Sequence, residues 1–153
     1  QDVSDDHIDR IWLRGGINFL AADSVMMLTL RFRMQNQASF ETISPNDLAL
    51  KDAQFLIRRV RIRMNGFVVD PRLTFLLQLG FSRNDMDFDN TQFANVLRDA
   101  MVTYRVQPNF HLGLGLGKLP GNRERVISSG EQQFIDRSIV NRNFNLDRDV
   151  GVQ

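Results

Sequence analysis

The chain has 153 residues, no cysteine and 42% hydrophobic residues. No apolar run approaches the roughly 18 residues that a membrane-spanning helix needs, so a transmembrane helix is excluded. The 19 basic and 18 acidic residues leave a net charge of +1, which does not indicate general nucleic-acid binding through net charge. All the basic residues except Lys51 and Lys118 are arginine, so the sequence strongly favours guanidinium over ammonium groups.

The chain begins at Gln1 without a start methionine, a signal peptide or a lipidation motif, which predicts a processed or truncated product. Residues 1–10 are predicted to form a flexible segment, and a short strand follows over 11–21. Apolar and polar residues then alternate with the period of two that indicates β-strands. The alternation predicts strands over 25–35, 55–65, 72–82, 96–106 and 110–118, and a further strand beginning near Arg148.

Short and long connections alternate along the chain. Residues 22–24, 67–71 and 107–109 carry the Asp, Pro or Asn signals of tight turns. The predicted long, polar loops are residues 36–53, 83–95 and 119–145. Strands of about ten residues, with short turns at one end and long loops at the other, are typical of an outer-membrane β-barrel. A soluble β-sandwich that binds anions remains an alternative, although it has no reason to gather its long loops at one end.

The polar side of the predicted strands is rich in arginine. On this side the only carboxylate is Asp99, whereas seven residues are cationic: Arg31, Arg33, Arg59, Arg61, Arg63, Arg72 and Arg105. If the apolar side faces lipid, these arginines face the lumen, where they lower the energy of anions and raise that of cations. A guanidinium is always protonated and holds two phosphate oxygens at once. The sequence therefore predicts a passive anion-selective channel, with Arg31, Arg33, Arg59, Arg61 and Arg63 in the wall of the anion pathway.

Arg58 and Arg98 fall on the apolar side of their predicted strands. Both lie near the ends that lead into long loops, where a lipid-facing arginine reaches lipopolysaccharide phosphates or extends to water. We therefore predict that these two arginines form a lipid and lipopolysaccharide rim. A slip in the assigned register is the competing explanation.

Two stretches carry a family resemblance. The first runs from Phe55 to Gly66 and contains Arg58-Arg59-Val60-Arg61. The second comprises residues 116–120, Ser128-Ser129, Phe134, Arg137-Ser138, Phe144 and residues 148–153. The first is similar to the Arg-Arg-x-Arg strand of the phosphate-selective porin O and P family. The second resembles that family's third extracellular loop and following strand.

The resemblance implies an all-β fold, a transmembrane antiparallel β-barrel of 16 strands in the bacterial outer membrane. It also implies a homotrimer that passes inorganic phosphate or similar anions. Residues 1–153 would form the N-terminal part of one barrel domain, about six or seven strands. We accordingly expect the natural polypeptide to exceed twice the 17.7 kDa of this chain.

In the family the third loop folds into the barrel, so the resemblance makes 119–145 a candidate constriction loop. It places cationic side chains near the narrowest point of the pathway: Lys118, Arg123, Arg125, Arg137 and Arg142. Glu124, Glu131 and Asp136 are close in sequence, and solvated ion pairs with them are the alternative for the loop arginines.

Other chemistry is weakly supported. The glycines from Gly113 to Gly117 do not complete a nucleotide-binding motif, and small lumen-facing residues that leave room for an inserted loop explain them better. Asp85, Asp87 and Asp89 resemble the start of a calcium loop that lacks its glycine and its closing glutamate. We predict no catalysis, no metal and no cofactor. The alternative function is a structural or docking barrel with an occluded pore, bound to other outer-membrane proteins.

Overall fold

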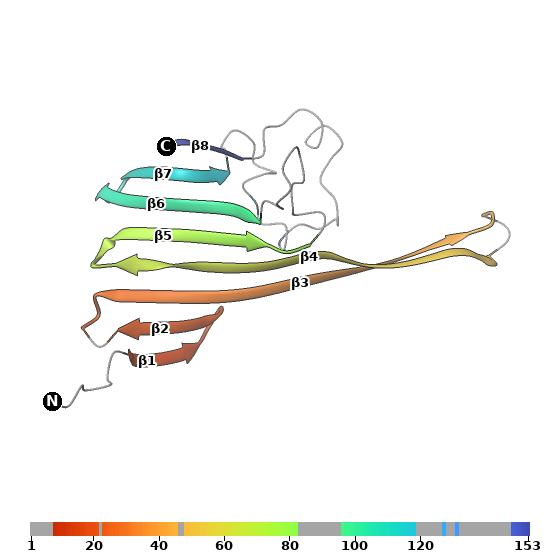
Figure 1. The fold of residues 1–153 in the computed structure, drawn as a ribbon, viewed down its shortest axis with the longest axis horizontal. Helices are drawn as coiled ribbons and strands as arrows, with labels where there is room; N and C mark the ends of the chain where they lie inside the picture. The colour runs from red at the N-terminus through yellow and green to blue at the C-terminus, as the bar shows by residue number, and fades with distance from the viewer. Residues whose placement is uncertain are drawn as a thin grey trace.

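A computed structural model describes residues 8–21, 23–45, 48–82, 96–118, 127, 131 and 148–153. They form one antiparallel sheet in which every strand pairs with the next along the chain (Figure 1). The strands are β1 (Ile8–Leu13), β2 (Ile17–Ala21), β3 (Met26–Thr42), β4 (Leu50–Val68), β5 (Asp70–Gly80), β6 (Leu97–Gln107), β7 (Phe110–Lys118) and β8 (Arg148–Val152). The predicted all-β antiparallel fold is confirmed. In these ranges no helix is long and apolar enough to cross a membrane.

The strand predicted over 11–21 is a hairpin. β1 and β2 pair antiparallel, with Leu13 opposite Ile17, and Gly15 turns the chain with a φ of 65°, a backbone conformation that glycine adopts without steric cost. Because β1 begins at Ile8, the flexible segment predicted over 1–10 overlaps a strand by three residues. Residues 1–7 lie outside the described residues.

β3 and β4 continue well beyond their neighbours as a two-stranded arm (Figure 1). β2 pairs with β3 only as far as Leu30, and β5 pairs with β4 only from Arg61 onward. In the arm, Phe40 and Phe55 stack edge to face with ring centroids 5.7 Å apart. The predicted loop over 36–53 is thus mostly strand, and the connection is 43–49. The run of amide and small residues over 35–39 of β3 weakens the alternation that would have indicated this.

The sheet lacks the apolar core of a soluble domain. Among the described residues, Met101 is the one buried hydrophobic side chain, whereas Leu114 and Val150 on one face are 61% and 71% exposed. A soluble sandwich would cover such a face with a second sheet, but the described strands form a single sheet. Exposed apolar area of this kind is stable against lipid and unfavourable in water.

A buried amide joins the first hairpin to the rest of the sheet. Asn18 is 5% exposed, and its Nδ2 donates to the carbonyl oxygens of Trp12, Arg14 and Gly16 at 3.1–3.2 Å. Its Oδ1 accepts a 2.7 Å hydrogen bond from the hydroxyl of Thr29 in β3. Asn18 therefore closes the β1–β2 turn and ties it to β3 at the same time.

Replacing Asn18 with aspartate is expected to release the β1–β2 hairpin. The carboxylate has no N–H to donate and faces three carbonyl oxygens, so the change leaves buried acceptors unpaired at a cost of about 2–4 kcal/mol. The fluorescence of Trp12, the one tryptophan of the sequence, should shift to longer wavelength in the detergent-solubilised protein. Asn109→Asp, in the exposed β6–β7 turn, is the matched control. An unshifted Trp12 spectrum in the Asn18 variant would contradict this role.

Candidate functional site

The register of β3 and β4 gathers the predicted wall arginines on one face. Arg31 lies opposite Arg63, Arg33 opposite Arg61 and Gln35 opposite Arg59. Directly paired residues in an antiparallel sheet share a face, so these five arginines define what we call the arginine face. The intervening pairs, such as Phe32 with Ile62, define the opposite, apolar face. The alternation in the sequence predicted that these five arginines share one side of the sheet, and the register of β3 and β4 agrees.

Arg31 and Arg63 form the most accessible cationic pair. Both are exposed and lie directly opposite each other on neighbouring strands. Like charges in this position destabilise a sheet. A hollow of about 890 Å³ is lined by Arg31, Arg33, Arg61 and Arg63. An anion in the hollow would relieve the repulsion between the two guanidinium groups.

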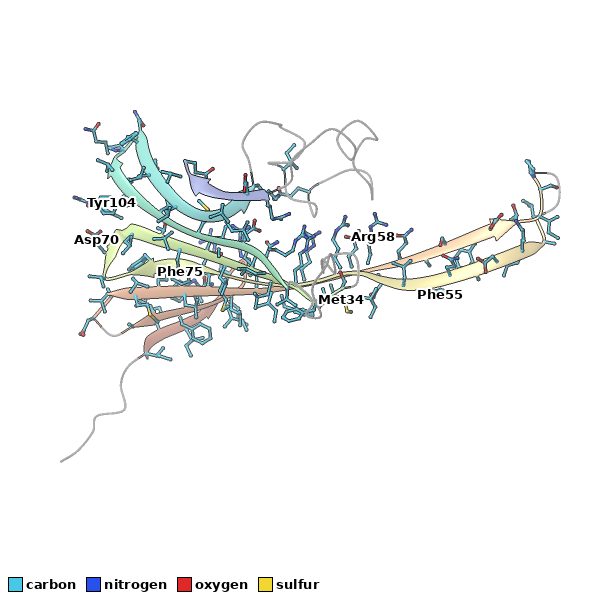
Figure 2. All side chains as sticks on the ribbon, turned by 45° about the horizontal axis from the view of Figure 1, so that its top comes forward. Met34, Phe55, Arg58, Asp70, Phe75 and Tyr104 are labelled. Carbon is cyan, nitrogen blue, oxygen red and sulfur yellow. The ribbon has the colours of Figure 1, made fainter. Side chains whose placement is uncertain are left out.

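A β-bulge carries Arg58 to the arginine face. The register shifts between the pairs Gln35–Arg59 and Asn36–Ile57, which leaves Arg58 as the extra residue of β4. Its Nη1 donates to Gln37 Oε1 at 2.6 Å, and Gln37 shares a parity with Gln35 and Arg33. Figure 2 shows the Arg58 side chain on the opposite side of the sheet from Met34. The assignment of Arg58 to the apolar side therefore differs from the structure, because a bulge interrupts the alternation.

Arg98 also occupies a bulge. Gln78 pairs with Asp99 and Leu79 with Leu97, so Arg98 is the extra residue of β6, and it is half-buried. A β-bulge therefore explains why both Arg58 and Arg98 depart from the predicted alternation. A bulge adds one residue to a strand and re-aims its side chain while bending the strand locally, and a single sequence does not reveal one.

The acid of the predicted wall is paired. Arg148 Nε donates to Asp99 Oδ1 at 2.9 Å, and the two side chains are only 10% and 7% exposed. The pair links β8 to β6 across Gly117 of β7, which lies opposite Asp149. Asp99 also lines the hollow that Arg31 and Arg63 line, and its carboxylate is held by Arg148. Sequence analysis missed this partner, because nothing local links residues that are 49 positions apart.

The glycines of β7 make room for a methionine. A Cβ atom at Gly117 would lie 2.9 Å from Met101 Sδ, and one at Gly113 would lie 3.1 Å from Met101 Cε. Met101 pairs with Gly115 and is 8% exposed. The space above these glycines, which the sequence reading assigned to an inserted loop, is thus at least partly filled by a side chain of the neighbouring strand.

The remaining predicted site residues lie at the margins of the described sheet. Lys118 ends β7 opposite Arg148 and lines the same hollow as the wall arginines. Arg105 lies opposite His111 near the β6–β7 turn, and Arg72 is exposed at the start of β5. The predictions for residues 83–95 and for Arg123, Arg125, Arg137 and Arg142 fall outside the described residues.

One antiparallel sheet with an exposed apolar face and arginines on the opposite face has the features of a segment of an outer-membrane β-barrel. The family model for the phosphate-selective porin O and P proteins matches residues 29–153. The chain belongs to this family, which is a family of channels rather than enzymes and which implies the bacterial outer membrane as its location. Comparison with the curated proteins and with the solved structures finds no match.

Proposed function

We propose that this chain forms the wall of a passive, anion-selective channel whose solute is phosphate or a similar oxyanion. The observation that carries the proposal is the direct opposition of Arg31 and Arg63, both exposed and lining the same hollow. Two guanidinium forks facing one space suit an oxyanion that offers several acceptor oxygens. The family supports the same solute class.

The geometry also suits conduction rather than tight binding. Arg31 and Arg33 lie two positions apart on β3, and Arg61 and Arg63 repeat this spacing on β4. Two residues along a strand span about 6.6–6.8 Å. Conduction requires binding sites that attract an anion but do not hold it tightly. Adjacent weak sites at this spacing let an anion pass from one site to the next.

The double variant Arg31→Gln with Arg63→Gln is expected to lower anion-over-cation permeability. One unit charge at about 5 Å in water-like surroundings contributes on the order of 1 kcal/mol, so the ratio should fall about fivefold or more. The measurement is the reversal potential of the full-length protein in a planar bilayer with a potassium chloride gradient. Lys51→Gln, which removes one cation at the exposed Lys51–Glu41 pair of the arm, is the control.

Unchanged selectivity in the double variant would count against the arginine wall. A wild-type protein that passes no ions would instead favour the docking subunit with an occluded pore. Cation preference in the wild type would exclude the proposed function outright.

We also propose assembly into a homotrimer, with contacts to lipopolysaccharide and other outer-membrane proteins. β1 and β8 form the edges of the described sheet, and hydrocarbon does not tolerate unpaired strand edges. In the assembled channel these edges pair with further strands.

Arg98 stays a proposed lipopolysaccharide contact, whereas we assign Arg58 to the anion pathway. Cross-linking in native membranes followed by mass determination tests the trimer.

A further inference from the structure

Two apolar residues share the face and the hollow of the arginines. Leu76 of β5 lies directly opposite Met101 of β6. Leu76 precedes Gln78 by two positions, and Gln78 lies opposite Arg63, so the register places Leu76 and Met101 on the arginine face. Both line the hollow of about 890 Å³. The inner face of a water-filled barrel is normally polar, so this apolar pair needs an explanation.

Packing within the sheet explains only Met101. Its side chain is 8% exposed and lies against Gly113 and Gly117, where it fills the space that the glycines leave. Leu76 is only half-buried, and its neighbour on β4 is the polar Asn65. Leu76 therefore keeps part of its apolar surface open on the side of the hollow.

Charge changes along one row of residues across the sheet. Arg31 and Arg63, both exposed, begin the row on β3 and β4. Gln78 of β5 comes next, opposite Arg63 on one side and Asp99 on the other. Asp99 of β6 is 5% exposed and bound to Arg148. An anionic group in the hollow is therefore attracted to the β3–β4 side of this row.

The apolar pair lies one step from the cationic pair. Arg63 directly opposes Gln78, so Leu76 is the diagonal neighbour of Arg63. Diagonal neighbours on antiparallel strands are about 7–8 Å apart. A ligand whose anionic group meets Arg31 and Arg63 can thus lay an attached ring over Leu76, and the flexible thioether of Met101 suits contact with an aromatic ring. An inorganic oxyanion has no atoms that reach this pair.

We propose that the hollow binds an organic anion, with one oxyanion group on Arg31 and Arg63 and an apolar ring over Leu76 and Met101. The inference rests on the proposed anion channel and names the class of solute that this part of the pathway favours. One anionic group suits the row of charges, because a second one at the far end of the ligand would approach Asp99, which also lines the hollow.

The first test compares two anions that carry the same charged group. Benzenesulfonate has an aromatic ring and methanesulfonate has only a methyl group, and both are fully ionised at neutral pH. Each is added to the full-length wild-type protein while it conducts chloride across a planar bilayer, and the concentration that halves the conductance is measured. We expect benzenesulfonate to act at roughly a tenth of the methanesulfonate concentration, because its ring leaves water for an apolar surface.

Leu76→Asn separates apolar contact from the size of the ligand. Asparagine is close to leucine in shape but offers the ring no apolar surface, so the preference for benzenesulfonate should fall severalfold. The half-blocking concentration of methanesulfonate should stay the same. Leu76→Ala, which adds no polar group, should also lower the preference, and Leu76→Ile should keep it. Leu48→Asn, at an 80% exposed position outside the strands, is the matched control and should leave the preference unchanged.

The charged group is tested separately. The double variant Arg31→Gln with Arg63→Gln should raise the half-blocking concentrations of both sulfonates by a similar factor, because both carry the same anionic group. The ratio of the two concentrations should then stay near its wild-type value. A ratio that falls to one in this variant would contradict separate contacts for the charged group and the ring.

The outcomes separate this inference from the proposed function. If wild type is anion-selective but the two sulfonates block at the same concentration, the apolar contact is overturned. A preference that persists unchanged in both Leu76→Asn and Leu76→Ala overturns it as well, because ligand size alone then accounts for the block. If wild type itself shows no anion selectivity, the proposed function fails first, and the inference fails with it.

Discussion

Gly66→Ala is expected to prevent the sheet from forming. A Cβ atom at this position of β4 would overlap the carbonyl oxygen of Met27 and lie 3.2 Å from Leu28 Cα. Both obstacles belong to the backbone of β3, which cannot yield as a flexible side chain can. Gly66 pairs with Leu28 on one side and Phe75 on the other, so separating the strands there breaks two ladders. A cost above about 4 kcal/mol follows, among the largest for one substitution.

Heat-modifiable mobility in gel electrophoresis of the refolded, full-length protein measures this effect. The Gly66 variant should lack the fast-migrating folded band. Gly151→Ala serves as the control, because a Cβ atom at Gly151 of β8 would have no neighbour within 4 Å, and the folded band should persist. A folded Gly66→Ala protein would mean that β3 and β4 are not as close there as the structure places them.

Asp99→Asn is the second change with a large expected effect. It removes the charge that faces the Arg148 guanidinium, in a pair whose side chains are 10% and 7% exposed. Breaking a buried ion pair by removing one of its charges costs about 3–5 kcal/mol. Because Arg148 begins β8 and the pair ties β8 to β6, we expect β8 to loosen first. Hydrogen exchange of Val150 and Gly151 amides should rise before that of β5.

A double-mutant cycle identifies the cause. Asp99→Asn combined with Arg148→Gln removes both charges, so it should cost less than the sum of the two single changes. Additive losses would show that Asp99 and Arg148 contribute separately. In the channel, Asp99→Asn also removes a negative charge from the lining of the hollow, so the anion-over-cation permeability ratio should not decrease.

Selectivity and stability respond to different residues in this molecule. Arg31 and Arg63 stay exposed and oppose each other, an arrangement that lowers stability and that the proposed anion channel would explain. Asn18, Gly66 and the Asp99–Arg148 pair hold the strands together. Variants of the first group should change ion selectivity while leaving the folded band intact, and variants of the second group should weaken or remove the folded band.

Most of the strand order and the common face of the wall arginines could be predicted from the sequence. Period two assigns each residue to a side, and Arg31, Arg33, Arg59, Arg61 and Arg63 keep that period without interruption. The β7 range agrees at both ends with the predicted 110–118, because turn residues and a proline flank it. Alternation is a local property, and each strand carries it by itself.

The features that only the tertiary structure decided depend on the relative placement of neighbouring strands. The bulges at Arg58 and Arg98 can be recognised only when two neighbouring strands are aligned. The arm beyond Arg61 exists because β3 and β4 continue to pair with each other there. The Asp99–Arg148 pair needs three strands in register. The sequence by itself determined an antiparallel sheet with an apolar side and an arginine side, since side-chain direction follows from backbone geometry. Which arginine meets which acceptor was decided by the alignment of strands distant in the chain, and no local pattern encodes that alignment.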